Sequence, residues 1–292
     1  MTDEWADSVG KLDLDAYLRR VGYDGPAAPT EQVLGALHRA HLVAIPFENL
    51  DIMLGRPVRM DLESIQAKLV TGRRGGYCFE HGQLFGAVLE RLGFSVERLL
   101  ARVSRPGQVL PRTHLTLRVG TPDRLGVWLA DVGFGSSPPG PLSLRRLRSG
   151  GPQEVDGWTY EVAPDGRLAG EAWPGKPGVG GEWLLRELQG GEWVTLYRFD
   201  DQRVYPADVV MANHYTSTHP DSWFTHTPVV VRRSSGAITS LLGRVLTVTR
   251  PGHVKERREL TDEEWASSLR DVFGLSFPPE DVAALVASAA GV

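Results

Sequence analysis

Apolar residues in the first third of the chain recur every three or four positions, the spacing of one face of an amphipathic helix. This pattern predicts helices at residues 12–23, 30–45, 61–70 and 78–92. Thr30 and Asp61 are suitable N-cap residues, because their side-chain oxygens can accept hydrogen bonds from N–H groups of the first helical turn. Gly93 provides a C-terminal stop for the last of these helices.

From Phe94 onward the apolar period changes to two, which is typical of half-buried strands separated by Gly, Pro and Asp turns. Strands are predicted at residues 94–103, 114–119, 126–132, 157–163, 182–188, 192–199, 227–233, 236–242 and 244–250. A helix and a connector are expected within 205–224, and two helices in the tail. The first tail helix begins at Thr261 with the spacing of a capping box, and the second begins near Pro279. Helices, then strands, then a mixed tail indicate an α+β protein of three modules.

Composition narrows the class of protein. The 292 residues are 41% hydrophobic and 23% charged, which is ordinary for a globular chain. The net charge of −4 argues against a general nucleic-acid binder, whose domain would be basic. The acidic, polar N-terminus resembles no targeting segment, and no apolar run is long enough to span a bilayer. We therefore expect a cytoplasmic protein with neither nucleic acid nor membrane as a partner.

The chain has one cysteine, Cys78, which excludes an internal disulfide and a thiolate zinc site, and no metal is expected. Cys78 lies in the first turn of the helix predicted at 78–92, at the top of its apolar face. A helix N-terminus carries partial positive charge, which favours a nucleophilic thiolate. Gly75 and Gly76 would let the chain enter the helix at a tight angle and leave space beside the sulfur. The alternative is a buried, inert cysteine that packs as a small hydrophobe.

Two predicted strands supply an imidazole and a carboxylate on one face. If Val119 pairs with Gly126 across the turn, an antiparallel register places His114 opposite Asp131. The Cβ atoms of directly opposed residues lie about 4.5–5.5 Å apart, close enough for a histidine–carboxylate hydrogen bond. A cysteine at a helix start together with such a pair predicts acyl transfer. Asp131 would orient the ring of His114, the ring would take the thiol proton, and the sulfur would attack an acyl carbon.

Four segments, in this order and at similar spacing, resemble the arylamine N-acetyltransferase family: IPFENLDIMLG, RRGGYCFEHGQLFGAVLERLGF, RTHLTLRV and WLADVGFG. The resemblance covers most of residues 12–135 and is weaker beyond them. It implies a helical bundle at 1–92, a β-barrel at 93–204 and an α/β lid at 205–292. It also implies a catalytic core similar to that of papain-type and transglutaminase enzymes.

The resemblance further implies that Cys78 carries an acetyl group and that His114 and Asp131 complete a catalytic triad. Residues near the substrate or coenzyme A cleft would be Phe47, Thr113, Phe134 and Gly135. Acetyl-CoA would be the acyl donor, and an aromatic amine or hydrazine the acceptor, in a ping-pong reaction. Weaker candidates for the border of the coenzyme A groove are His219, Trp223 and His226, since histidines in a connector are more often solvated or structural.

Three other functions stay open at this point. A macrolactam-forming amide synthase would use the same chemistry with a carrier-bound acyl thioester as donor. A cysteine peptidase or transglutaminase-like hydrolase would share the geometry of the triad, and a binding protein would hold an inert cysteine. The sequence also leaves the preferred amine, the physiological acyl donor and the oligomeric state undetermined.

Overall fold

The computed structural model describes residues 5, 9–122, 126–147, 151–165 and 181–289. The N-terminal part folds into α2 (Leu14–Val21), α3 (Glu31–Ala44), α4 (Leu50–Met53), α5 (Leu62–Gln66) and α6 (Cys78–Arg91). A π-helical turn at Ala67–Thr71 continues α5. The four helices predicted from apolar spacing are therefore confirmed, with α4 as a short addition.

The expected capping residues begin and end these helices. The side chain of Thr30 accepts from the N–H of Val33 at 3.3 Å, and that of Asp61 accepts from the N–H of Ser64 at 2.9 Å. Gly93 follows the C-cap of α6 with a φ of 92°, a left-handed conformation that glycine adopts without steric cost. Local side-chain chemistry therefore sets the ends of the helices.

Within the described residues, an antiparallel sheet has the strand order β5-β4-β3-β2-β9-β8-β7-β6 and forms a nearly closed barrel. Its strands are β2 (Ser95–Val103), β3 (His114–Gly120), β4 (Val127–Ala130), β5 (Leu142–Ser143), β6 (Gln153–Val155), β7 (Trp158–Pro164), β8 (Trp183–Gln189) and β9 (Glu192–Phe199). Buried side chains from β2, β7, β8 and β9 fill its interior. Helix α6 packs against the other side of β3, where a Cβ on Gly82 would lie 2.8 Å from Leu115.

A second antiparallel sheet has the order β1-β10-β11-β12-β13. Its strands are β1 (Phe47–Glu48), β10 (Val229–Ser234), β11 (Ala237–Leu242), β12 (Val245–Arg250) and β13 (Val254–Glu259). The edge strand β1 comes from the N-terminal part of the chain, and Phe47 pairs with Val231 of β10. The second sheet therefore joins residues that lie far apart in the sequence.

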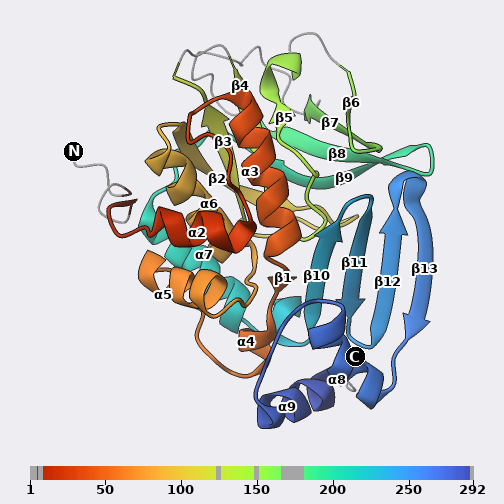
Figure 1. The fold of residues 1–292 in the computed structure, drawn as a ribbon. Helices are drawn as coiled ribbons and strands as arrows, with labels where there is room; N and C mark the ends of the chain where they lie inside the picture. Colours follow the sequence, from red (N-terminus) through yellow and green to blue (C-terminus); the bar gives the residue numbers. More distant parts are fainter. Residues whose placement is uncertain (1–4, 6–8, 123–125, 148–150, 166–180, 290–292) are drawn as a thin grey trace.

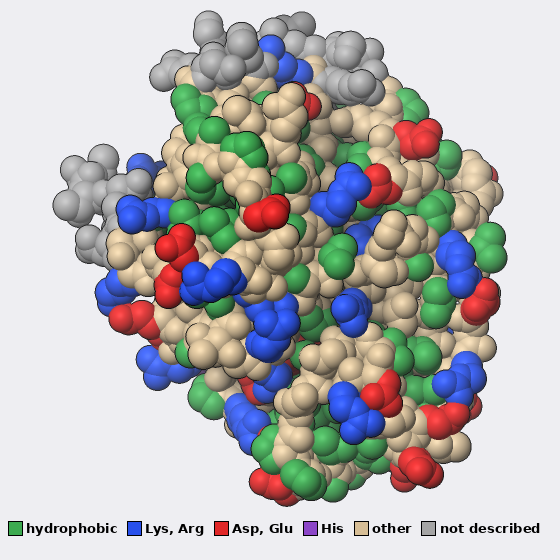
Figure 2. Space-filling model, viewed as in Figure 1, with side chains coloured by type: hydrophobic (Ala, Val, Ile, Leu, Met, Phe, Trp, Pro, Cys, Tyr) green, Lys and Arg blue, Asp and Glu red, His purple; other side chains and the backbone are tan. Residues whose placement is uncertain are grey.

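Helices α7 (Pro206–Thr218), α8 (Asp262–Asp271) and α9 (Pro279–Ala289) complete the described fold. Figure 1 shows α2 and α5 on one side of the molecule, α3 near its middle, β10 to β13 on the other side, and α8 and α9 below that sheet. On the face shown in Figure 2, basic and acidic side chains lie interspersed. The arrangement is the predicted α+β class. None of the described helices is both long and apolar enough to cross a membrane.

Candidate active site

Cys78 is the first residue of α6. Its position is fixed by Tyr77, which precedes it, and by Glu80, which lies in the first turn of the helix. The backbone N–H of Tyr77 donates to a carboxylate oxygen of Glu80 at 3.1 Å. Glu80 is buried and forms an ion pair with Lys68 at 2.9 Å. Burial raises the pKa of Glu80, while Lys68 acts in the opposite direction. This buried pair anchors the N-terminus of the helix that carries the sulfur.

The two glycines before the cysteine allow a close contact between backbones. The N–H of Glu48 donates to the carbonyl of Gly76 at 2.7 Å, so the segment runs beside β1. A Cβ at Gly75 would lie 2.2 Å from the carbonyl oxygen of Pro46, and one at Gly76 would lie 2.7 Å from Glu80. The absence of side chains at Gly75 and Gly76 is therefore what allows Pro46, Glu48 and Glu80 to approach this segment so closely.

His114 and Asp131 are brought together as expected. The Nε2–H of His114 donates to Oδ2 of Asp131 at 2.6 Å, and each residue is only 2% exposed. The predicted register between their strands is wrong by two residues, since Val119 pairs with Trp128 and not with Gly126. A shift of two keeps every side chain on the same face. Asp131 follows the last residue of β4, and its side chain still reaches the ring.

Asp131 is held by further hydrogen bonds. Its Oδ1 accepts from the N–H of Gly133 at 2.9 Å and from the hydroxyl of Ser137 at 3.4 Å. Burial would raise the pKa of Asp131, but His114, Gly133 and Tyr197 together hold it below its usual range. Both carboxylate oxygens are therefore occupied, which leaves one orientation for the group.

Burial alone would lower the pKa of His114, but Asp131 outweighs it and raises that pKa to about 10. The side chain of Cys78 acts in the same direction as Asp131, as expected where sulfur and ring are neighbours. Because Nε2 is bonded to Asp131, Nδ1 is the ring nitrogen that remains for the sulfur. The ring is fixed between the rings of Phe134 and Tyr197, with centroid distances of 5.1 and 4.9 Å.

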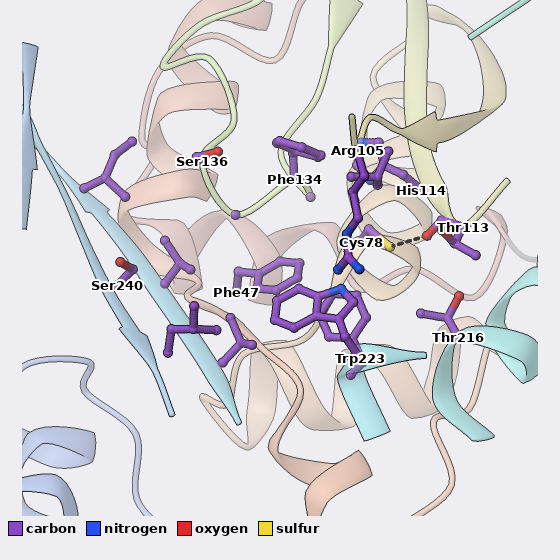
Figure 3. A pocket seen from close by; sticks show the side chains of 18 of the residues that line it. Phe47, Cys78, Arg105, Thr113, His114, Phe134, Ser136, Thr216, Trp223 and Ser240 are labelled. Carbon is purple, nitrogen blue, oxygen red and sulfur yellow. Dashed lines mark hydrogen bonds between the residues drawn. The ribbon is translucent and has the colours of Figure 1, made fainter. Parts of the chain in front are cut away.

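The cysteine lies close to the backbone of two segments, the one that precedes β3 and the one that follows β4. Its sulfur lies 3.5 Å from the carbonyl oxygen of Thr113, the contact drawn as a dashed line in Figure 3. A Cβ at Gly133 would lie 2.9 Å from the Cα and from the carbonyl oxygen of Cys78. Glycine at this position therefore lets the segment after Asp131 approach the start of α6.

Cys78 and His114 open onto a cavity of about 420 Å³. All four residues expected near a substrate cleft line it: Phe47, Thr113, Phe134 and Gly135. Figure 3 shows the rings of Phe47, Phe134 and Trp223 around the cavity, with Ser240 of β11 opposite the cysteine. Of the weaker candidates, Trp223 lines the cavity, whereas His219 and His226 do not. Among the described residues, no cluster of His, Cys, Asp or Glu side chains is arranged to hold a metal ion.

Sequence reasoning missed Ser137 and Tyr197, which support Asp131 and His114. Ser137 lies six residues after the carboxylate, in a segment with no strand or helix periodicity. Tyr197 lies on β9, which reaches β3 only because β2 pairs with both strands. No local pattern indicates either contact, since each depends on the assembled barrel.

Comparison with known proteins identifies the family of the chain. A family model described as N-acetyltransferase matches residues 31–282. The arylamine N-acetyltransferase of Mycobacterium tuberculosis is 36% identical, covering 91% of this chain and 90% of that protein. The arylamine N-acetyltransferase of Escherichia coli is 35% identical, covering 90% of this chain and 88% of that protein.

Solved structures give the same result. The Nocardia farcinica arylamine N-acetyltransferase has a TM-score of 0.86 at 39% identity, covering 95% of this chain and 94% of that one. The Mycobacterium marinum arylamine N-acetyltransferase in complex with CoA has a TM-score of 0.82 at 34% identity, covering 95% of this chain and 98% of that one. By sequence and by structure over nearly its whole length, the chain belongs to the arylamine N-acetyltransferase family of acyltransferases.

Proposed function

We propose that the protein transfers an acetyl group from acetyl-CoA to the nitrogen of an arylamine or arylhydrazine through an acetylated Cys78. The observation that carries the proposal is that Cys78 and His114 line one cavity while Asp131 accepts a hydrogen bond from the ring of His114. It is supported by the names of the relatives and by the CoA complex of one structural neighbour. The roles of the three residues follow from their chemistry.

In the first half-reaction, the sulfur of Cys78 attacks the thioester carbonyl carbon of acetyl-CoA. The C–S bond to coenzyme A breaks, and the departing thiolate takes the proton held on His114. The imidazolium beside the sulfur stabilises the thiolate before attack, and Asp131 stabilises the imidazolium. The partial positive charge at the start of α6 stabilises negative charge on the sulfur. The products are acetyl-Cys78 and free coenzyme A.

In the second half-reaction, the amine nitrogen attacks the acetyl carbonyl carbon and the sulfur leaves as a thiolate. The proton lost by the amine passes to Nδ1 of His114, which restores the starting charge pair. Because coenzyme A leaves before the amine reacts, the two substrates give ping-pong kinetics.

The cavity favours an aromatic acceptor. Its walls near the sulfur carry the rings of Phe47, Phe134, Trp223 and Phe224, which would cover the faces of an arylamine. An aromatic amine is weakly basic and uncharged at neutral pH, so its lone pair is free to attack. A protonated alkylamine has no lone pair and would have to lose its solvation in this apolar setting.

The test is to mix the enzyme with acetyl-CoA without an acceptor and to measure coenzyme A release. We expect a burst of one coenzyme A per active site, then faster release when 4-methoxyaniline is added, with parallel double-reciprocal plots. Cys78→Ala is the control and should give no burst. A continuous release of coenzyme A and acetate without acceptor would indicate a hydrolase. No burst from acetyl-CoA, together with acylation by a carrier-bound thioester, would indicate the amide synthase.

A further inference from the structure

Asn49 follows β1 at the N-cap position of α4, and it is only 2% exposed. The side chain of an asparagine at an N-cap normally accepts a hydrogen bond from an N–H of the first helical turn. Within the described structure, the side chain of Asn49 makes no such bond to α4. A carboxylate oxygen of Glu48 accepts from the N–H of Leu50 at 2.7 Å instead. The burial of this amide therefore has a reason other than the helix that it precedes.

The amide of Asn49 bonds to a segment far along the chain, between α7 and β10. Its NH₂ group donates to the carbonyl of Phe224 at 2.8 Å and to the carbonyl of Thr227 at 2.9 Å. Its oxygen accepts from the N–H of Val229 at 2.8 Å. An asparagine side chain offers two N–H donors and one oxygen acceptor, so each of these groups is occupied. The three bonds fasten this segment to the end of β1.

The fastened segment contains a compact turn, residues 223–227, which we call the aromatic turn. It begins with the short 3₁₀-helix Trp223–Thr225, and the N–H groups of His226 and Thr227 both donate to the carbonyl of Trp223, at 3.1 and 3.0 Å. On its other side, the hydroxyl of Ser222 donates to the carbonyl of Thr216 on α7 at 2.6 Å. The turn is therefore closed by its own bonds and is attached to α7 at one end and to Asn49 at the other.

The aromatic turn supplies part of the cavity wall. Trp223 and Phe224 are half-buried and line the same cavity as Cys78, as Figure 3 shows for Trp223. The ring of Phe224 packs edge-on against Tyr77, with 6.0 Å between centroids, and lies 6.1 Å from the ring of Phe47. The Trp223 ring lies 4.5 Å from that of Phe224. The turn thus brings two rings to the side of the cavity formed by β1 and the start of α6.

The placement of these rings depends on Asn49, because a ring moves with the backbone that carries it. Without the amide, the aromatic turn would keep its internal bonds but would lose its attachment to the end of β1. A misplacement of about 1 Å in a group that positions substrate can lower a rate about 10²-fold. Since β1 also carries Phe47, one short strand sets both sides of this aromatic wall.

We propose that Asn49 is a positioning residue for the second half-reaction, because it holds the aromatic turn where Trp223 and Phe224 cover the ring of the acceptor. This inference rests on the proposed function. Weakening the attachment lowers the reaction with aromatic acceptors and spares acceptors without a ring, which need only a nitrogen at acetyl-Cys78. A contact of the turn with the acyl donor is the alternative, and the experiment separates the two.

The test compares phenylhydrazine with hydrazine as acceptors. Both present a terminal NH₂ group bonded to nitrogen, and they differ by the ring that the aromatic turn would cover. In ping-pong kinetics, kcat/KM for the acceptor reports on the reaction of the acetyl-enzyme with free acceptor. The ratio of the two kcat/KM values does not depend on the fraction of folded enzyme. A general loss of stability would therefore leave the ratio unchanged.

Asn49→Asp is the variant that tests the attachment. It keeps the shape and the oxygen that accepts from Val229, but it has no N–H for the carbonyls of Phe224 and Thr227 and places negative charge against them. We expect kcat/KM to fall about tenfold for phenylhydrazine and less than twofold for hydrazine, since a well-placed aromatic contact is worth about this factor. An unchanged ratio would overturn the proposal.

Gln153→Glu is the matched control. Gln153 is a buried amide that accepts from the N–H of Ser143 at 2.7 Å and donates to its carbonyl at 3.1 Å, but it does not line the cavity. This variant should leave the ratio unchanged. Trp223→Ala should lower the ratio about tenfold without altering the amide, so it tests the proposal even if Asn49→Asp fails to fold. An unchanged ratio in Trp223→Ala would also overturn the proposal.

A double-mutant cycle shows whether Asn49 acts through the aromatic turn. In a protein that already carries Trp223→Ala and Phe224→Ala, adding Asn49→Asp should change the ratio less than twofold, because the rings that it positions are gone. A further tenfold fall would show that Asn49 acts independently of these rings, which contradicts the proposal.

The burst of coenzyme A release separates this test from that of the proposed function. Its absence in the wild-type enzyme would refute the proposed function, whereas a burst with an unchanged acceptor ratio in Asn49→Asp would refute only this inference. The burst rate of Asn49→Asp should stay within about twofold of that of the wild type. A slower burst together with an unchanged ratio would show that the aromatic turn positions the acyl donor, which contradicts the acceptor assignment.

Discussion

Replacing Asp131 by asparagine tests how the ring of His114 is oriented. In the native site one carboxylate oxygen accepts from Nε2–H of His114 and the other from the N–H of Gly133. An asparagine can offer only one oxygen to these two donors. If the oxygen faces Gly133, the amide NH₂ faces Nε2, which must then lose its proton. Nδ1 becomes protonated and can no longer take a proton from Cys78 or from the amine.

The size of the effect follows from the charge pair. Asp131 raises the pKa of His114 to about 10 from its ordinary value of 6.5, and this difference corresponds to about 5 kcal/mol. Breaking a buried charge pair by removing one partner costs about 3–5 kcal/mol. If the transition state loses most of this stabilising free energy, the rate should fall by about 10²–10⁴-fold. The fold should survive, because the substitution preserves shape.

The assay is the rate of coenzyme A release in the first turnover, measured by rapid mixing, with thermal unfolding of the same samples. Asp281→Asn is a matched control, because Asp281 is also buried and paired, at 2.7 Å to Arg56, but lies on α9 away from the cavity. It should lower stability without changing the rate. A loss of less than tenfold in Asp131→Asn would refute the reasoning and leave the pair a merely architectural role.

Three further predictions concern the same site. Cys78→Ala should abolish transfer while leaving the melting temperature nearly unchanged, and retained turnover would contradict the nucleophile assignment. Gly133→Ala should slow the first turnover by about 10²-fold, because the added Cβ would displace the segment after Asp131. Gly120→Ala, at the end of β3 away from His114, should have little effect, because its Cβ would make only ordinary contacts. Because the folded pKa of His114 is raised, the stability that the charged ring contributes is full below pH 6.5 and is lost as the pH rises through about 10. Urea unfolding between these pH values should show a larger loss in wild type than in Asp131→Asn, and equal losses would contradict the pairing.

The sequence predicts the parts of the site that depend on local patterns. Period-two alternation places His114 and Asp131 on one face, and that result survives a register error of two residues because only an odd shift exchanges faces. The position of Cys78 in the first turn of its helix follows from helical spacing and from the stop at Gly93. The resemblance to a family adds Phe47, Thr113, Phe134 and Gly135, all of which line the cavity.

Contacts between distant segments lie beyond local patterns. Gly75 and Gly76 are conspicuous in the sequence, but their role depends on β1, which lies beside them only in the folded chain. Trp158 and Glu187 look like ordinary residues of barrel strands, and it is evident only in the assembled fold that both line the cavity. The division into units at 1–92, 93–204 and 205–292 stays a prediction, and the pairing of β1 with β10 shows that the first and third would be joined by a common sheet.

The role of Cys78 as the acetyl carrier is tested most directly by mass spectrometry of the protein after incubation with acetyl-CoA in the absence of an amine. We expect one added acetyl group on the peptide that contains Cys78, and we expect this group to move to the amine when an arylamine is added. An acetylated amine formed at the full rate without any acetyl group on Cys78, or by the Cys78→Ala variant, would contradict this role.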